Sequence, residues 1–122
     1  MFNDTIVSQA TPYGSSAIAL VRLSGKKSFS FAKKISKKTT SFKHLTPTYL
    51  PIYIDQNEKL DAGMFLPFKA PASYTGEDVV EISCHGNPLI VEAIIEELLS
   101  FGARLAEPGE YTKRAFLNGK LD

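Results

Sequence analysis

The sequence has one cysteine, Cys84, no tryptophan and no long hydrophobic run among its 122 residues. A single cysteine cannot form a disulfide within the chain, which excludes the small disulfide-rich secreted domains. Every apolar stretch is much shorter than the ~18 residues that a membrane helix needs, so we expect no membrane-spanning segment. No basic stretch precedes an apolar one at the start, so no signal or transit peptide is predicted. We therefore expect a cytoplasmic protein.

The composition is typical of a globular domain, with 43% hydrophobic and 22% charged residues. A chain of 122 residues is long enough to close one hydrophobic core without metals or disulfides. We therefore predict a single domain over residues 1–122. The chain is too short for a complete multi-domain enzyme, so we expect it to be a piece of a longer protein.

The net charge of +1 combines two halves of opposite sign. Residues 1–60 hold nine lysines and arginines against three acids, and residues 61–122 hold five against ten. Most of the excess lies between Lys26 and Lys43, where lysines alternate with apolar residues. Such a stretch can bind nucleic-acid phosphates, or it can be the solvated face of an amphipathic helix. It contains no arginine, which favours the solvated face.

Hydrophobic patterning predicts strands and helices interspersed along the chain. Strands are expected at residues 5–7, 17–23, 48–54, 60–68 and 79–84, with a short one at 103–105. Helices are expected after residues 24–25, from Asn87 to Gly102, and from Glu110 to about Asn118. This order predicts an α+β domain with one mixed sheet of about five strands and about three helices.

Arg22 is the anomalous residue of the second predicted strand. Both alternating faces of this strand are apolar, so we expect a central strand that is covered on both sides. Arg22 shares a face with Ile18 and Leu20, and a buried guanidinium needs an anionic partner from the protein or from a ligand.

Arg22, Glu81 and Lys120 form a candidate binding set. A carboxylate such as Glu81 can accept two parallel N–H bonds from an aminopyrimidine-type edge, while lysine and arginine can hold an anionic tail. An internal ion pair between Arg22 and Glu81 explains two of the three residues equally well. The residues alone leave both interpretations open.

The sequence contains no complete catalytic or metal-binding signature. Residues 25–28 (GKKS) lack the earlier glycine of a phosphate loop and the Ser or Thr directly after its lysine. Cys84 and His85 are adjacent, so in a continuing strand they point to opposite faces and cannot act as nucleophile and base. One cysteine and two histidines provide no zinc-ligand set. We predict no catalytic residue and no metal site.

Five motifs follow one another along the chain: DTIVSQATP (4–12), VRLSG (21–25), SYTGED (73–78), CHG (84–86) and PGEYTKRAFLNGKLD (108–122). Together they resemble the amino-terminal domain of the tRNA modification GTPases of the MnmE or TrmE family. The resemblance implies the tetrahydrofolate-binding fold of the glycine-cleavage aminomethyltransferases, a homodimer, and a cofactor that is 5-formyl-tetrahydrofolate or a related tetrahydrofolate. The family's folate contacts map onto Arg22, Glu81 and Lys120.

The resemblance also implies a larger protein. In this family a helical domain and a potassium-dependent GTPase domain, which takes GTP and magnesium, follow the amino-terminal domain. The full protein works with the flavin protein MnmG to modify C5 of the wobble uridine of certain tRNAs. The chain lacks the GTPase domain, so we expect it to hydrolyse nothing alone. Two alternatives are a tRNA-binding module acting through Lys26–Lys43 and a purely structural dimerisation domain.

Overall fold

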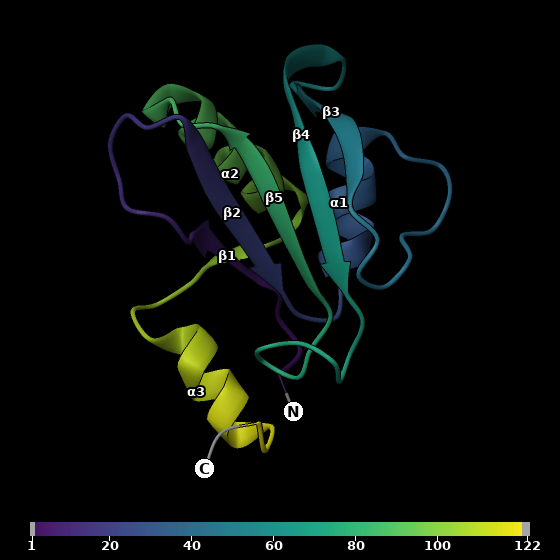
Figure 1. Cartoon of the computed structure of the whole chain (residues 1–122), viewed down its shortest axis with the longest axis vertical. Coiled ribbons are helices and arrows are strands. Elements are labelled where there is room, and N and C mark those ends of the chain that lie inside the picture. The colour runs from purple at the N-terminus through teal and green to yellow at the C-terminus, as the bar shows by residue number, and fades with distance from the viewer. Residues whose placement is uncertain (1, 121–122) are drawn as a thin grey trace.

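The computed structural model describes residues 2–120, which form one sheet and three helices (Figure 1). The strands are β1 (Ile6–Gln9), β2 (Ile18–Ser24), β3 (Thr48–Ile54), β4 (Glu58–Phe68), β5 (Val79–His85) and β6 (Arg104–Leu105). The helices are α1 (Ser28–Ser36), α2 (Pro88–Phe101) and α3 (Glu110–Leu117). The predicted α+β class is confirmed. The sheet has six strands in this part of the chain, where about five were expected, because the two-residue β6 pairs with β1.

The sheet is mixed, with the strand order β3-β4-β5-β2-β1-β6. Neighbouring strands are antiparallel except β1 and β6, which are parallel. β2 and β5 are therefore neighbours in the middle of the sheet, although α1, β3 and β4 separate them in the sequence. Their register pairs Arg22 directly with Glu81. Directly opposite residues share a face and have Cβ atoms about 5 Å apart, so the register itself brings two predicted site residues together.

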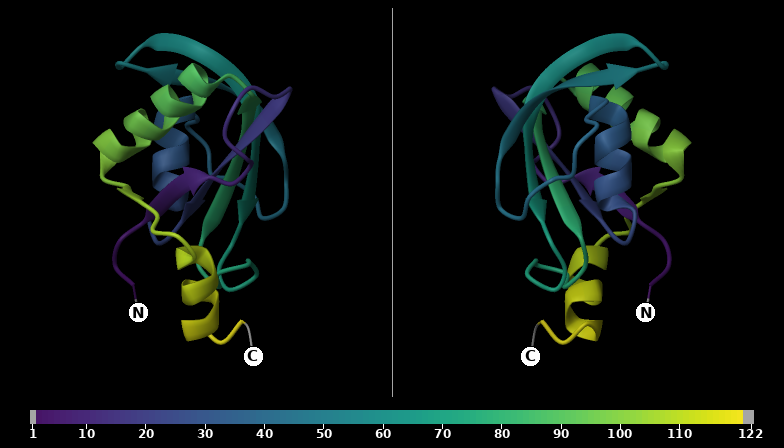
Figure 2. Two further views of the ribbon diagram at one scale, coloured as in Figure 1. Left: turned by 90° about the vertical axis from the view of Figure 1, so that its left-hand side faces the viewer. Right: turned by 90° about the vertical axis from the view of Figure 1, so that its right-hand side faces the viewer.

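Helices α1 and α2 both pack against the same face of the sheet (Figure 2). Alternate residues of β2 and β5 point toward these helices and meet apolar residues from both of them. The resulting core includes Ala19, Val21, Leu23, Val80, Ile82, Cys84, Phe31, Ile35, Val91, Ile94 and Leu98. Among residues 2–120, neither α1 nor α2 lies over the opposite face, which we call the open face (Figure 2); α3 meets it near Arg22 through Tyr111.

The expectation that β2 is covered on both sides is wrong. Only the face with Ala19, Val21 and Leu23 is buried, whereas Ile18 on the open face is 63% exposed. The apolar pattern of the strand is real, but both helices pack on one side of the sheet. The remaining apolar side chains of β2 are therefore available at the surface.

Helix α2 begins and ends as predicted. The Asn87 side chain accepts a hydrogen bond from the N–H of Leu89 at 2.9 Å, and Pro88 occupies the first turn. Gly102 ends the helix with a φ of +119°, in a left-handed conformation that glycine adopts at little cost. These signals are local in the sequence, which is why this helix could be recognised from the residues alone.

Helix α3 lies apart from the other two helices, beyond the end of β2 (Figure 1). It begins at Glu110 as predicted and ends at Leu117, within one residue of the expected end. This position brings Tyr111 and Arg114 of α3 against β2 and the loop that precedes β5. The helix thus forms one side of the region that contains Arg22.

Candidate functional site

Arg22 and Glu81 form an ion pair on the open face. The Nε of Arg22 donates a hydrogen bond to Oε2 of Glu81 at 3.0 Å, and Nη2 lies 2.9 Å from the same oxygen. The side chains are 27% and 22% exposed, respectively, so the guanidinium is half-buried and not enclosed as the sequence suggested. The expected anionic partner is confirmed to be Glu81. Among residues 2–120, Oε1 of Glu81 and Nη1 of Arg22 have no hydrogen-bond partner.

Tyr111 of α3 contacts both the backbone and the side chain of Arg22. Its hydroxyl donates to the backbone carbonyl of Arg22 at 2.8 Å and accepts from the Ser8 hydroxyl at 3.0 Å. The guanidinium carbon of Arg22 lies 5.4 Å from the centre of the Tyr111 ring, which is a cation–π contact. Burial raises the pKa of Tyr111, so this hydroxyl remains a hydrogen-bond donor at neutral pH.

Lys120 lies near the site but does not join the pair. Its backbone N–H donates to the carbonyl of Ala115 at 2.8 Å, in the turn that follows α3. The side chain runs past Gly76, where an added Cβ would lie 3.2 Å from Cγ of Lys120. The structure gives Lys120 no hydrogen bond or ion pair with Arg22 or Glu81. It therefore brings two of the three predicted residues together and places the third beside the loop that precedes β5.

A cavity of about 330 Å³ lies between β2, this loop and the start of α3. It is lined by Arg22, Tyr74, Gly109, Tyr111 and Thr112, and we call it the tyrosine cavity. The hydroxyls of Tyr74 and Thr112 are 3.0 Å apart, so a hydrogen bond links the loop to α3 across it. The cavity has two aromatic rings and one cation in its wall.

A buried arginine holds this region together. Arg114 of α3 is fully buried, and its guanidinium donates to the carboxylates of Asp4 (2.5 Å), Glu110 (3.2 Å) and Glu77 (3.1 Å). Hydrogen bonds from Arg104 to Asp4 and Glu110 extend the network, and they lower the pKa of Asp4 and that of Glu110, the latter to about 2. These acids therefore remain charged at neutral pH.

The same network fixes the loop before β5. The hydroxyl of Ser24, at the end of β2, donates to Glu77 at 2.7 Å and lies 2.7 Å from the hydroxyl of Thr75. Because Glu77 also binds Arg114, the loop is held to β2 and α3 together. Sequence reasoning did not single out Arg114. The only local signal is the opposite charge of Glu110 one helical turn earlier.

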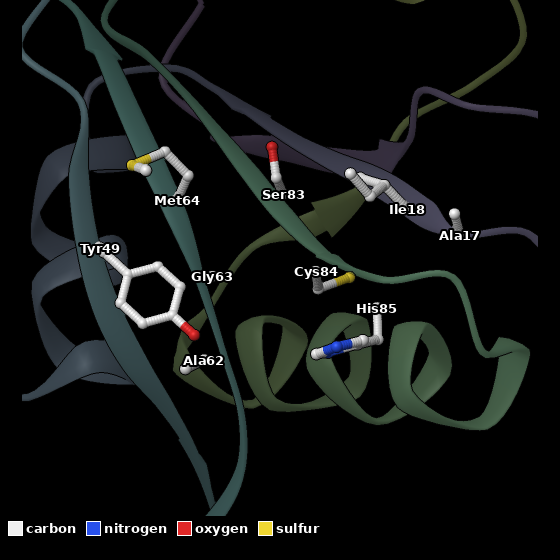
Figure 3. Close-up of a pocket in the computed structure, with 9 residues that line it drawn as sticks. All are labelled: Ala17, Ile18, Tyr49, Ala62, Gly63, Met64, Ser83, Cys84 and His85. Carbon is white, nitrogen blue, oxygen red and sulfur yellow. The ribbon is translucent and has the colours of Figure 1, made fainter.

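The open face also carries a mostly apolar cavity of about 310 Å³. Figure 3 shows its lining residues Ala17, Ile18, Tyr49, Ala62, Gly63, Met64, Ser83, Cys84 and His85. Ile18, Tyr49 and Met64 are exposed although they are large and apolar. Isolated exposed apolar residues are common, but a cluster around a hollow is typical of an interaction surface.

Cys84 and His85 do not form a reactive pair. The Cys84 side chain is buried in the core, and burial is the main cause that raises the pKa of its thiol to about 11. His85 lies on the open face, where its Nδ1 is 2.7 Å from the carboxylate of Asp61. The two side chains point to opposite faces, which confirms the prediction from strand geometry.

The lysines between Lys26 and Lys43 pack partly against the domain itself. The ammonium group of Lys34 lies 5.0 Å from the ring centre of Phe101, and that of Lys37 lies 4.3 Å from the ring centre of Tyr53. These contacts are usual for lysines that extend along an apolar surface. They favour the solvated-face interpretation, and nucleic-acid binding stays a prediction.

Two kinds of feature are absent from residues 2–120. No helix there is long and apolar enough to cross a membrane. In the same residues, no group of three or more His, Cys, Asp or Glu side chains is arranged to hold a metal ion.

Comparison with known proteins identifies the family. The family model described as "GTP-binding protein TrmE N-terminus" matches residues 5–120. Proteins named "tRNA modification GTPase MnmE" are 53% identical over 119 residues in Aquifex aeolicus, 50% over 123 in Nitratiruptor sp. and 51% over 120 in Aliarcobacter butzleri. Each alignment covers 98% of this chain and 27% of the relative, so the chain spans about a quarter of their length. The chain belongs to the family of TrmE and MnmE N-terminal domains.

Proposed function

We propose that this chain is the cofactor-binding and dimerisation part of a tRNA modification GTPase, and that it binds a 5-formyl-tetrahydrofolate-type cofactor through Arg22, Glu81 and Lys120. The observation that carries the proposal is the Arg22–Glu81 pair. It lies on an open sheet face, and each partner keeps one polar atom without a hydrogen bond among the described residues. Because the two side chains are 27% and 22% exposed, these remaining atoms are accessible to a ligand.

The residues present fit such a cofactor. A pterin ring presents adjacent N–H groups on one edge, and a carboxylate can accept two of them in parallel. Glu81 has one free oxygen and shares the other with Arg22. The remaining donors of Arg22 and the ammonium group of Lys120 suit the polar or anionic groups of the cofactor. The cofactor would supply the one-carbon unit, while the chain would bind and orient it.

We also propose that a second copy of this chain covers the open face. Ile18, Tyr49 and Met64 surround the cavity of Figure 3 and are exposed in the single chain. Burial of such a cluster against its own copy would remove apolar area from water, which favours association. Arg22 and Glu81 lie on the same face, so the cofactor would bind close to the dimer interface.

The wider reaction would belong to the longer protein. The relatives are named tRNA modification GTPases, and this chain covers about a quarter of them. We propose that GTP, potassium and magnesium bind outside this chain, and that tRNA and an MnmG-type flavin protein bind the full-length cytoplasmic protein. In that complex the C5 position of the wobble uridine would be modified. The chain alone would hydrolyse no GTP.

Calorimetry with 5-formyl-tetrahydrofolate tests the cofactor proposal. We expect binding by the wild type and a loss of at least about tenfold in affinity for Glu81→Ala, because the carboxylate would accept hydrogen bonds from the pterin edge. Glu92→Ala, an exposed acid on α2, is the matched control and should bind like the wild type. Equal affinities of Glu81→Ala and the wild type would refute the assignment. A dimer without folate binding would instead favour the purely structural role.

A further inference from the structure

Helix α3 is attached to the domain differently from α1 and α2. Those two helices supply residues to the apolar core, whereas no residue of α3 belongs to that core. The buried residues of α3 are Glu110, Arg114 and Ala115, of which only the small Ala115 is apolar. Phe116 and Leu117 are each 59% exposed. Burial of apolar area therefore contributes less to holding α3 in place than it does for the other two helices.

Polar contacts with three other segments hold α3. Near its start, the Tyr111 hydroxyl donates to the carbonyl of Arg22 in β2. In its middle, the guanidinium of Arg114 binds carboxylates of the N-terminal segment and of the loop before β5. Directly after its last turn, Nδ2 of Asn118 donates to the carbonyl of Thr75 in the same loop at 2.8 Å. These contacts are spread along the whole helix, so movement of the helix as one body breaks all of them.

The separation from the core makes α3 a distinct structural unit. Folded proteins open in cooperative units, and units with few buried apolar contacts open at a lower free energy than the core. Helix α3 lies beyond the end of β2, apart from α1 and α2 (Figure 1). Detachment of α3 therefore removes no side chain from the apolar core between the sheet and the other two helices.

Detachment of α3 would also change the surroundings of Arg22. The Tyr111 hydroxyl holds the backbone carbonyl of Arg22, and the Tyr111 ring centre lies 5.4 Å from the guanidinium carbon. The Nε of Arg22 donates to Glu81 at 3.0 Å. Loss of the Tyr111 contacts frees one side of the guanidinium, so its hydrogen bond to Glu81 would open more often.

We infer that α3 is a latch, a helix that attaches to and detaches from the sheet as one unit while the core remains folded, and that the attached helix holds the Arg22 side chain against Glu81. Tyr111 is the positioning residue, and the contacts of Arg114 and Asn118 keep it in place. The inference goes beyond the proposed function, because it concerns the chain without a ligand. Its test therefore has the same meaning whether or not the chain binds a folate.

Native-state hydrogen exchange of the ligand-free chain, followed by NMR, tests whether α3 opens by itself. The hydrogen-bonded amides from Lys113 to Asn118 should share one opening free energy. Their exchange should be at least about tenfold faster than that of Val21 and Ile82 in the core, after correction for intrinsic rates. Exchange of the α3 amides at the rate of these core amides would show that α3 unfolds only with the whole domain, and would overturn the inference.

Two substitutions at opposite ends of α3 test the link to Arg22. Tyr111→Phe keeps the ring and removes the hydroxyl. It should speed the exchange of the α3 amides and of the Arg22 Nε–H about fivefold, which is the scale of one hydrogen bond. Asn118→Ala removes the bond to Thr75 and should speed both by a similar factor, although Asn118 makes no hydrogen bond to Arg22. The core amides should keep their rates, which also shows that each variant is folded.

Matched controls alter the same residue types outside α3. Tyr13→Phe changes a tyrosine that is 86% exposed, and Asn57→Ala removes an exposed amide between β3 and β4; neither should change these rates. If Asn118→Ala speeds only the last-turn amides and leaves the Arg22 Nε–H unchanged, α3 frays from its end and is not a latch. An unchanged Arg22 Nε–H in Tyr111→Phe would overturn the positioning role of Tyr111.

Discussion

Arg22 and Glu81 lie directly opposite each other on β2 and β5, and the Nε of Arg22 donates to Oε2 of Glu81 at 3.0 Å. The pair lies in the middle of a sheet, where partners are usually buried. About a quarter of each side chain is nevertheless exposed, because neither α1 nor α2 covers the open face. Water screens such a pair, so its contribution to stability is small. A small contribution to stability is what the proposed ligand-binding role predicts for this pair.

A double-mutant cycle tests this difference. We expect Arg22→Gln and Glu81→Gln each to lower the free energy of unfolding by about 1 kcal/mol or less, with a coupling energy of roughly 0.2–1 kcal/mol. Urea denaturation of the wild type, both single variants and the double variant measures it. A coupling energy well above about 2 kcal/mol would mark the pair as a structural element and support the dimerisation-only alternative.

Arg114 should contribute strongly to the free energy of unfolding, unlike the Arg22–Glu81 pair. Arg114→Met leaves Asp4, Glu77 and Glu110 close together without their shared cation, so we expect a loss of about 3–5 kcal/mol in the free energy of unfolding. The control is Lys113→Met, an exposed neighbour on α3, which should change it by about 0.5 kcal/mol or less. Equal urea midpoints for the two variants would contradict the structural role of this network.

The lowered pKa of Glu110 predicts that the folded state loses stability in acid. Hydrogen bonds from Arg104 are the main cause that lowers the pKa of Glu110 from 4.5 to about 2. Because the pKa is lower in the folded state, the stabilisation is complete above the unfolded value of 4.5 and is lost as the pH falls toward 2. We expect Glu110→Gln to be less stable than the wild type by roughly 2–3 kcal/mol at about pH 5, with a gap that closes on acidification.

Urea denaturation at several pH values in this window measures that gap. Asp4 binds the same two arginines as Glu110, and its lowered pKa contributes to the acid sensitivity of both proteins. A gap that stays constant from about pH 5 to about pH 2.5 would show that Glu110 contributes through packing and not through its charge.

If a second copy covers the open face, a charge introduced there should disrupt the dimer. Ile18→Lys places an ammonium group within the exposed apolar cluster around the cavity of Figure 3, so we expect a monomer in light scattering coupled to size exclusion. Leu89→Lys is the matched control, because Leu89 is 76% exposed and lies on α2, on the opposite side of the sheet. It should leave the dimer intact. A monomeric Leu89→Lys with a dimeric Ile18→Lys would assign the interface to the helical side.

Elements with local signals were predictable from the sequence. Asn87, Pro88 and Gly102 mark the two ends of α2, and the alternation in β5 separates Glu81 from its buried neighbours Val80 and Ile82. Capping and strand alternation act over a few residues, so the chain alone encodes them. Arg22 was recognised for the same reason, as a cation in an otherwise apolar strand.

Contacts between distant segments were not predictable in this way. Arg114 meets Asp4 and Glu77 only because α3 folds back beyond the end of β2, and the tyrosine cavity exists only because Tyr74 and Tyr111 arrive there from different segments. The covering of β2 was predicted wrongly for a related reason, since an apolar pattern shows that a face avoids water but not which element covers it.

The sequence by itself determined the class of the fold and the ends of α2 and α3, and it predicted Arg22, Glu81 and Lys120 as site residues, because composition, periodicity and motifs are properties of the chain. The tertiary structure decided which of these residues meet. It paired Arg22 with Glu81 through the register of β2 and β5, placed Lys120 beside Gly76, and left one face of the sheet open. Strand register and helix placement depend on the packing of the whole core, which no local segment specifies.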